Sequence, residues 1–299
     1  MRTPAVYLLG AGTVLVLGVN WPIMARGVGV MPAEWLAAFR LGGAAILVTV
    51  FMAVRRGIRR PTRHDLPILF TVGVVQLAVV TTIVFAALRY APPGRSAILV
   101  YASTLWTFPL AAIVLHEQLT APRLIGLTLG CTGLVLLLEP WSTDWSNGRT
   151  VDGFGLLLLA SILNATTTVH VRAHSWRGSP LELMPWLLGI AALPITILAV
   201  VLHGLPRVEW TLSTTGIVVY QVALASAFAV WGLITLTRSV PAISASLIMM
   251  AVPVVGLLSS VVLVGESVSI AVVVSLAFVL GGVALGLRSD RGTVVVPSP

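Results

Sequence analysis

The chain alternates long apolar runs with short breaks that are rich in charged residues, prolines and glycines. A helix needs roughly 20 residues to cross the hydrocarbon core of a bilayer, and each apolar run is close to that length. The pattern therefore predicts an all-α membrane protein with ten transmembrane helices. The expected helices cover residues 5–25, 33–54, 66–88, 94–115, 121–138, 153–173, 181–203, 212–236, 241–264 and 269–287.

Composition agrees with a chain that lies in a membrane. Of its 299 residues, 58% are hydrophobic and 9% are charged, and the mean hydropathy is +1.02. A water-soluble domain of this length is far more polar. We interpret the 18 basic residues, all arginines, as contacts of the loops with the lipid bilayer and expect no nucleic-acid partner. Cys131 is the single cysteine, which excludes an internal disulfide or a cysteine metal cluster, and we expect no metal or cofactor.

The arginines also predict the orientation of the chain, because positively charged short loops resist translocation. With the N-terminus in the cytoplasm, twelve arginines lie on the cytoplasmic side, five lie on the opposite side and Arg40 lies within a helix. The cytoplasmic set is Arg2, Arg55, Arg56, Arg59, Arg60, Arg63, Arg123, Arg172, Arg177, Arg238, Arg288 and Arg291. The opposite set is Arg26, Arg89, Arg95, Arg149 and Arg207. We therefore expect a multi-pass protein of the cell (inner) membrane with both termini in the cytoplasm.

The two halves of the chain repeat each other. A shift of 149 positions superposes identical residues at several helix ends, and a shift of 148 does so near the start of each half. The pairs are Arg89 with Arg238, Pro92 with Pro241, Glu117 with Glu266, Gly133 with Gly282, Pro32 with Pro180, Glu34 with Glu182 and Ala44 with Ala192. Because each half holds an odd number of helices, the second half must be inverted in the membrane. We expect one five-helix repeat over residues 1–147, a second over 148–288 and a short cytoplasmic tail over 289–299.

Several segments of the chain resemble those of a known family. They are Gly18-Val-Asn-Trp-Pro22, Leu88-Arg-Tyr-Ala-Pro-Pro-Gly94, Glu117-Gln-Leu-Thr-Ala-Pro-Arg-Leu-Ile-Gly126, Arg238-Ser-Val-Pro241 and Val264-Gly-Glu266. With them the chain resembles the drug/metabolite transporter superfamily in its ten-helix EamA-type branch. The resemblance implies export or exchange of small metabolites, often amino acids, through a central cavity lined by helices 1, 3, 4, 6, 8 and 9.

Four amide side chains lie within the apolar runs: Asn20, Gln76, Asn164 and Gln221. Polar groups are costly in hydrocarbon and usually face a bundle interior or a water-filled cavity. The repeat places each amide of the first half four residues from an amide of the second, so the amides should lie on matching helix faces. We expect these side chains to contact substrate inside the membrane. The alternative is that they form hydrogen bonds between helices.

Aromatic side chains are expected to complete the cavity. Pro22 weakens the first helix beside Asn20 and Trp21, where local unwinding would expose backbone polar groups to a ligand. An ordinary proline kink is the alternative. Tyr101, Trp106 and Trp231 lie within apolar runs and are predicted to enclose an apolar part of the substrate. Membrane aromatic residues also pack between helices or form belts at the interface, which is the competing interpretation.

Few ionisable residues lie within the runs. We place Arg40 and His170 at the mouth of the cavity, with snorkelling to the membrane surface as the alternative for the arginine and packing as the alternative for the histidine. Glu117 and Glu266 are related by the repeat and lie at turns on opposite membrane faces. We expect these two carboxylates to stabilise the turns and not to carry protons.

The sequence has no carboxylate near the bilayer centre, which argues against coupling to protons or sodium ions. It predicts a secondary transporter that is not an enzyme and that moves a small neutral or zwitterionic metabolite, such as an amino acid, by facilitated efflux or exchange with alternating access. A membrane-embedded enzyme acting on lipid-linked substrates is the main alternative, and a scaffold or sensor is the third. The spacings Gly126-x-x-x-Gly130 and Gly282-x-x-x-Gly286 indicate close helix packing, within a monomer or in a homodimer.

Overall fold

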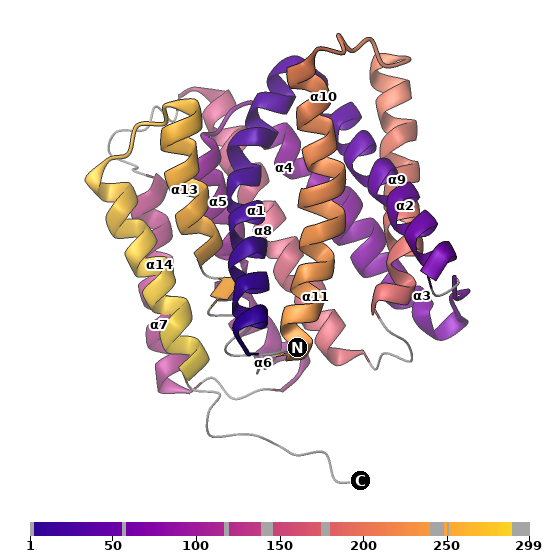
Figure 1. Cartoon of the computed structure of the whole chain (residues 1–299). Helices are drawn as coiled ribbons and strands as arrows, with labels where there is room; N and C mark the ends of the chain where they lie inside the picture. Colours follow the sequence, from indigo (N-terminus) through magenta and orange to yellow (C-terminus); the bar gives the residue numbers. More distant parts are fainter. Residues whose placement is uncertain are drawn as a thin grey trace, which may run out of the picture.

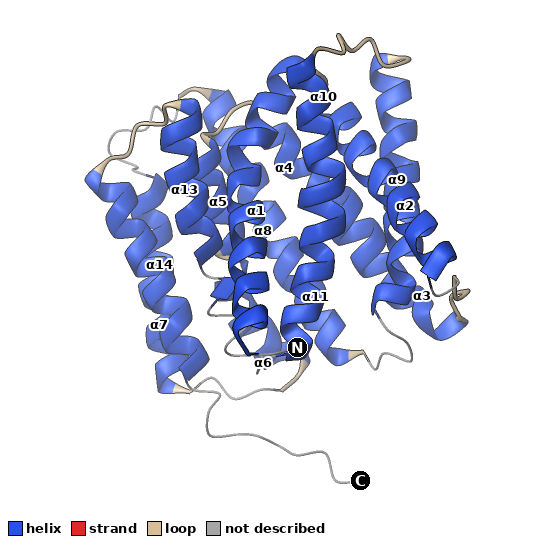
Figure 2. Ribbon diagram, viewed as in Figure 1, coloured by secondary structure: helices blue, strands red, loops and turns tan. Residues whose placement is uncertain are grey.

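The computed structural model of the chain is a bundle of helices (Figure 1). The structure describes residues 3–55, 58–116, 120–138, 146–174, 180–239, 248–249 and 251–288. Within these ranges the regular elements are all helices, joined by loops (Figure 2). Seven helical stretches of the described part are long and apolar enough to cross a membrane, and three shorter apolar helices accompany them, Leu124–Leu137, Ala251–Val264 and Ile270–Leu285. They coincide with the ten predicted helices, so the predicted fold class is confirmed.

Five helical spans make up the first half. They are α1 (Thr3–Val30); α2 (Ala33–Arg55); a third span composed of η1 (Arg63–Asp65), α3 (Leu66–Ile68), η2 (Leu69–Val80) and α4 (Thr81–Ala87); a fourth composed of α5 (Pro93–Tyr101) and α6 (Ser103–Val114); and α7 (Ala121–Leu138). Pro93 lies in the first turn of α5, where a backbone N–H would have no helical partner, so proline starts this helix without loss of a hydrogen bond.

The second half repeats this order. Its elements are α8 (Gly148–Ala173); α9 (Pro180–His203); an eighth span composed of α10 (Leu212–Val219), η3 (Tyr220–Phe228) and α11 (Ala229–Ser239); α13 (Ala251–Val264); and α14 (Ile270–Arg288). Side-chain caps begin two of these helices. Asn147 Oδ1 accepts a hydrogen bond from Arg149 N at 3.1 Å, and Thr211 Oγ1 accepts one from Thr214 N at 3.2 Å. The predicted start of the ninth helix lies outside the described residues.

Helices of the two halves pack in pairs that obey the repeat. Helix α7 packs along α14, α2 along α9, and α1 along α13. Helix α8, the counterpart of α1, packs on α5 and α6, which form the counterpart of the ninth span. If the two halves are exchanged, the pair of α1 with α13 corresponds to the pair of α8 with α5 and α6. The pairs of α7 with α14 and of α2 with α9 correspond to themselves, as an inverted repeat requires. Helix α1 begins and α14 ends at the same end of the bundle, which agrees with an even number of crossings (Figure 1).

Glycines allow α7 and α14 to approach backbone to backbone. A Cβ atom added at Gly282 would collide with the backbones of Gly126 and Gly130. One added at Gly133 would lie 2.9 Å from the carbonyl oxygen of Ser275. The close packing that the glycine motifs predict is therefore satisfied within one chain.

Helix α1 continues through Pro22 without a break. Because proline has no N–H, the carbonyl group of Gly18 loses its helical hydrogen-bond partner. Ser259 Oγ on α13 lies 3.4 Å from that carbonyl oxygen and also donates to Gly256 O at 3.0 Å. The unwinding considered beside Trp21 does not occur, since α1 stays helical on both sides of Pro22.

The third and eighth spans contain wide helical turns at corresponding places. Both η2 and η3 are π-type helices, in which an N–H group bonds to the carbonyl five residues earlier. A shift of 149 places η2 over residues 218–229, a range that includes all of η3. Gln76 lies in η2 and Gln221 in η3. Because π-type turns change the angle between successive side chains, residues four apart in these segments no longer share one face.

Candidate functional site

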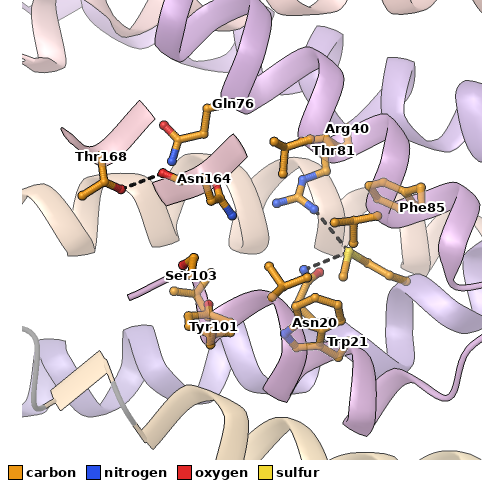
Figure 3. A pocket seen from close by; sticks show the side chains of 15 residues that line it. Asn20, Trp21, Arg40, Gln76, Thr81, Phe85, Tyr101, Ser103, Asn164 and Thr168 are labelled. Carbon is orange, nitrogen blue, oxygen red and sulfur yellow. Dashed lines mark hydrogen bonds between the residues drawn. The ribbon is translucent and has the colours of Figure 1, made fainter. Parts of the chain in front are cut away.

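A polar cavity of about 300 Å³ lies within the bundle (Figure 3). Helices α1, α2, α4, α5, α6 and α8 and the segment η2 all contribute to its wall. Its 15 lining residues are Leu17, Asn20, Trp21, Met24, Arg40, Gln76, Val80, Thr81, Val84, Phe85, Val100, Tyr101, Ser103, Asn164 and Thr168. The wall thus combines amide, hydroxyl, aromatic and aliphatic groups, which is the usual character of a small-molecule site.

Among the described residues of this lining, Arg40 is the one charged side chain. Its Nε donates to Ser226 Oγ on η3 at 3.0 Å, and its Nη1 lies 3.4 Å from Met24 Sδ. The guanidinium carbon lies 5.7 Å from the ring centroid of Phe85, within the range of a cation–π contact. In the part of the chain that the structure describes, no carboxylate pairs with Arg40. The side chain therefore points into the cavity and does not snorkel toward lipid headgroups.

Three of the four predicted amide residues line the cavity: Asn20, Gln76 and Asn164. Asn20 Nδ2 lies 3.3 Å from Met24 Sδ, and its buried Oδ1 has no hydrogen-bond partner among the described residues. Gln76 and Asn164 lie together on one side of the cavity, across from the guanidinium group (Figure 3). Thr168 lies beside them and was missed, although the repeat contains a signal for it, because Asn20 maps onto this position.

Gln221 departs from the pattern of the other amides. Its side chain is fully buried, and it is not among the residues that line the cavity. Neither Oε1 nor Nε2 has a hydrogen-bond partner among the described residues. The segment η3 that carries it packs against α1 and α2. The interhelical hydrogen bond considered as its alternative role is therefore also missing in the described part.

Two of the four predicted aromatic residues line the cavity. Trp21 and Tyr101 meet edge to face, with ring centroids 6.4 Å apart. Trp106 is half-buried on α6, and its buried indole N–H has no acceptor among the described residues. Trp231 is 41% exposed and packs against Phe228 with ring centroids 5.9 Å apart. Neither Trp106 nor Trp231 is among the lining residues.

His170 lies toward the C-terminal end of α8, outside the cavity lining. Its ring stacks on that of His174 with centroids 5.9 Å apart, and His174 lies 4.7 Å from the ring of His64. His174 Nε2 also lies 3.0 Å from the carbonyl oxygen of His64. Within the described residues, no group of three or more His, Cys, Asp or Glu side chains is arranged to hold a metal ion. The histidines therefore join α8 to η1 at one end of the bundle.

Glu266 lies in the turn before α14 and reaches the other repeat. Its carboxylate accepts hydrogen bonds from Gly94 N at 2.8 Å and from Arg95 N at 3.3 Å, in the first turn of α5. Burial raises the pKa of Glu266 above its ordinary value of 4.5, against the opposing effect of these two hydrogen bonds and of the Arg95 charge. Ser269 caps α14 by accepting a backbone hydrogen bond at 3.2 Å. Glu117, the counterpart of Glu266, lies outside the described residues.

Over the described residues, ten apolar helical spans in two halves of inverted order, with a polar cavity inside, are typical of a membrane transport protein. The sequence profile of the EamA-like transporter family matches residues 4–139 and again residues 152–288. The chain therefore belongs to the EamA-like transporter family. The family match supports a membrane transporter with a small-molecule substrate and not the membrane-embedded enzyme considered as the alternative.

Relatives of the chain also carry transporter names. A protein of Salmonella typhimurium strain LT2, named probable amino-acid metabolite efflux pump, is 27% identical over 86% of this chain and 86% of its own length. The Escherichia coli K12 protein of the same name is 26% identical over 85% of each chain. A probable terminal-alkyne amino-acid exporter of Streptantibioticus cattleyicolor is 24% identical over 94% of this chain and 92% of its own. One crystal structure shares the fold, with a TM-score of 0.68 and 21% identity over 97% of this chain and 98% of that protein.

Proposed function

We propose that the protein exports a small zwitterionic or neutral metabolite of the amino-acid class across the cytoplasmic (inner) membrane. The observation that carries this proposal is the cavity, which groups amide, hydroxyl and guanidinium side chains with aromatic rings. Such a lining suits a small molecule with polar and apolar parts, whereas a phosphorylated metabolite calls for several cationic groups. The names of the relatives, which refer to amino-acid metabolites and an amino acid, support this substrate class.

The arrangement of the two repeats supports alternating access, in which the repeats rock against each other and open the cavity to one face at a time. Side-chain contacts between the repeats lie at both ends of the bundle. His203 Nε2 lies 2.9 Å from Glu34 Oε2 at one end, and Arg59 Nη1 lies 3.6 Å from Glu182 Oε2 at the other. Partly exposed ion pairs contribute little stability, so such contacts can break and re-form during a transport cycle.

Transport is by facilitated efflux or exchange, driven by the gradient of the substrate itself. The lining of the cavity contains no Asp, Glu or His in the part of the chain that the structure describes, so it lacks the groups that ordinarily carry a coupled proton. One chain supplies all the described lining residues of the cavity, which supports a monomer as the transporting unit, whether or not chains associate as a homodimer.

Counterflow in liposomes tests this function. Purified protein is reconstituted into vesicles that contain one unlabelled amino acid at high concentration, and a trace of the same labelled amino acid is added outside. At least one neutral amino acid should accumulate transiently inside without an ion gradient, and protein-free vesicles should show no accumulation. The Gln76→Ala/Asn164→Ala double variant, which removes two polar lining groups, should slow it. Absence of flux for every standard amino acid would refute the substrate class, and accumulation that requires an imposed proton gradient would refute facilitated transport.

A further inference from the structure

Arg40 is a cation within a membrane-spanning helix, and the described residues provide no counter-ion for it. A guanidinium group in this setting is costly unless it is paired. The fold itself does not require charge at this place, because the repeat puts Leu188 at the corresponding position of α9, where it is 1% exposed in the hydrophobic core. The charge of Arg40 is therefore better explained by a ligand than by packing.

The guanidinium group keeps donors for such a ligand. It has five N–H groups, and those of Arg40 reach two acceptors in the described part, Ser226 Oγ and Met24 Sδ. The thioether sulfur of Met24 is a weak acceptor. The remaining donors lie at the cavity (Figure 3). The planar guanidinium group can donate two parallel hydrogen bonds to the two oxygens of a carboxylate. An amide or an ester lacks the second negatively charged oxygen and cannot accept this pair of hydrogen bonds.

The opposite side of the cavity has the complementary character. Gln76 and Asn164 present amide groups there (Figure 3). An amide group has an oxygen that accepts hydrogen bonds, and rotation about its last bond can turn this oxygen toward a ligand. Trp21 and Tyr101 add aromatic rings to the wall, and such rings attract a cation. In a cavity of about 300 Å³, a single small molecule spans both sides, with its anionic group at the arginine and its cationic group at the amides.

We propose that Arg40 binds the carboxylate of a zwitterionic substrate and that Gln76 and Asn164 bind its ammonium group. This binding mode rests on the proposed function, because it concerns the same cavity and the same class of substrate. Arg40 accordingly selects molecules that carry a carboxylate over amides and amines of the same shape. Arg40 on α2 also donates to Ser226 on η3, which belongs to the second repeat. The substrate carboxylate would therefore bind to the side chain that connects the two repeats.

Thermal stabilisation of the purified full-length protein by ligands measures binding separately from transport. L-leucine is compared with L-leucinamide, which lacks the carboxylate, and with 4-methylpentanoate, which lacks the ammonium group. A second series uses L-phenylalanine, its amide and 3-phenylpropanoate. In at least one series the amino acid should bind about ten- to a hundredfold more tightly than its amide, as expected for a hydrogen-bonded charge pair. R40Q should abolish this preference, and R40K, which keeps the charge but loses the fork, should retain part of it.

Controls separate the binding mode from the fold and from the function. R149Q removes an exposed arginine at the start of α8 and should bind like the wild type. Circular dichroism and a single symmetrical gel-filtration peak establish folding, and R40K provides the comparison if R40Q does not fold. Equal binding of amino acid and amide, full preference in R40Q or R40K, or no wild-type response in either series would refute the role of Arg40. If the role of Arg40 is refuted but the wild type still shows counterflow, the proposed function remains supported. If carboxylate binding depends on Arg40 but no amino acid is transported, only the proposed function is refuted.

Discussion

Gln76 and Gln221 lie at nearby points of repeat-related helices, yet their surroundings differ. Gln76 lines the cavity, where water or a ligand can satisfy its amide group. Gln221 is fully buried, and both atoms of its amide lack hydrogen-bond partners among the described residues. A buried polar group with unmet hydrogen bonds costs about 1–3 kcal/mol. The same residue type thus faces a cavity at one place and lowers stability at the other.

Gln221→Leu should stabilise the protein by about 1–2 kcal/mol, because leucine has a similar volume and removes the unmet amide without leaving a void. Thermal unfolding of the purified protein in detergent measures the change. Gln76→Leu is the matched control, which should leave the unfolding temperature almost unchanged and weaken amino-acid binding. A lower unfolding temperature for Gln221→Leu than for the wild type would show that this amide is satisfied in the membrane-embedded protein.

The partly buried carboxyl group of Glu266 should make the free energy of unfolding depend on pH. Because its pKa is raised above 4.5 by burial, the folded protein holds a proton over a pH interval in which the unfolded chain has released it. The resulting stabilisation is complete below pH 4.5 and is lost as the pH rises through the raised pKa. The stability of the wild type relative to Glu266→Gln should therefore fall across that interval in thermal unfolding. Exposed Glu209→Gln should follow the wild type, and parallel curves for wild type and Glu266→Gln would contradict the assignment.

At the scale of the helices, the contact between α7 and α14 is the least tolerant of added volume. Gly282→Ala should destabilise the protein by about 1–3 kcal/mol, because the new methyl group meets backbone atoms of Gly126 and Gly130, which cannot move aside like a flexible side chain. Gly155→Ala in α8 is the matched control, since a Cβ there has no neighbour within 4 Å. Denaturation in detergent should separate the two variants, and equal effects would mean that α7 and α14 pack less closely.

The elements themselves were largely predictable from the sequence. Helices α2, α7 and α9 begin within a residue or so of the predicted starts, because prolines, glutamate and arginine interrupt the apolar runs there. The inverted pairing followed from the repeat and the odd number of helices in each half. The same reasoning located Asn20, Gln76 and Asn164 on helices that meet at the cavity.

The wide turns of η2 and η3 were not predictable, and the comparison of Gln221 with Gln76 did not allow for them. The expectation that Gln221 shares a helix face with the counterpart of Gln76 assumed an ordinary α-helix, in which residues four apart are neighbours. In a π-type helix that relation fails. The inward direction of Arg40 was also beyond the sequence, because its partner Ser226 lies 186 residues away in the chain. Hydrophobic pattern alone does not distinguish an arginine that enters a cavity from one that snorkels.

At the scale of the whole molecule, several polar contacts at the two ends of the bundle run between the repeats. Glu266 of the second repeat accepts hydrogen bonds from α5 of the first, and His203 of the second contacts Glu34 of the first. At the other end, Trp186 Nε1 of the second repeat donates to the carbonyl oxygen of Arg59 at 2.8 Å. Neither repeat therefore has its end contacts complete without the other.

Reporter proteins fused to the two ends of the chain can test the fold and the membrane orientation separately. Because α1 begins and α14 ends at the same end of the bundle (Figure 1), reporters fused to the N-terminus and the C-terminus should lie on the same side of the membrane. The excess of arginines in the loops at that end predicts that this side faces the cytoplasm. Green fluorescent protein should therefore fluoresce at either terminus, and alkaline phosphatase should be active when fused after Gly204 at the opposite end. Termini on different sides would refute the ten-helix inverted repeat, whereas both termini outside would refute only the orientation.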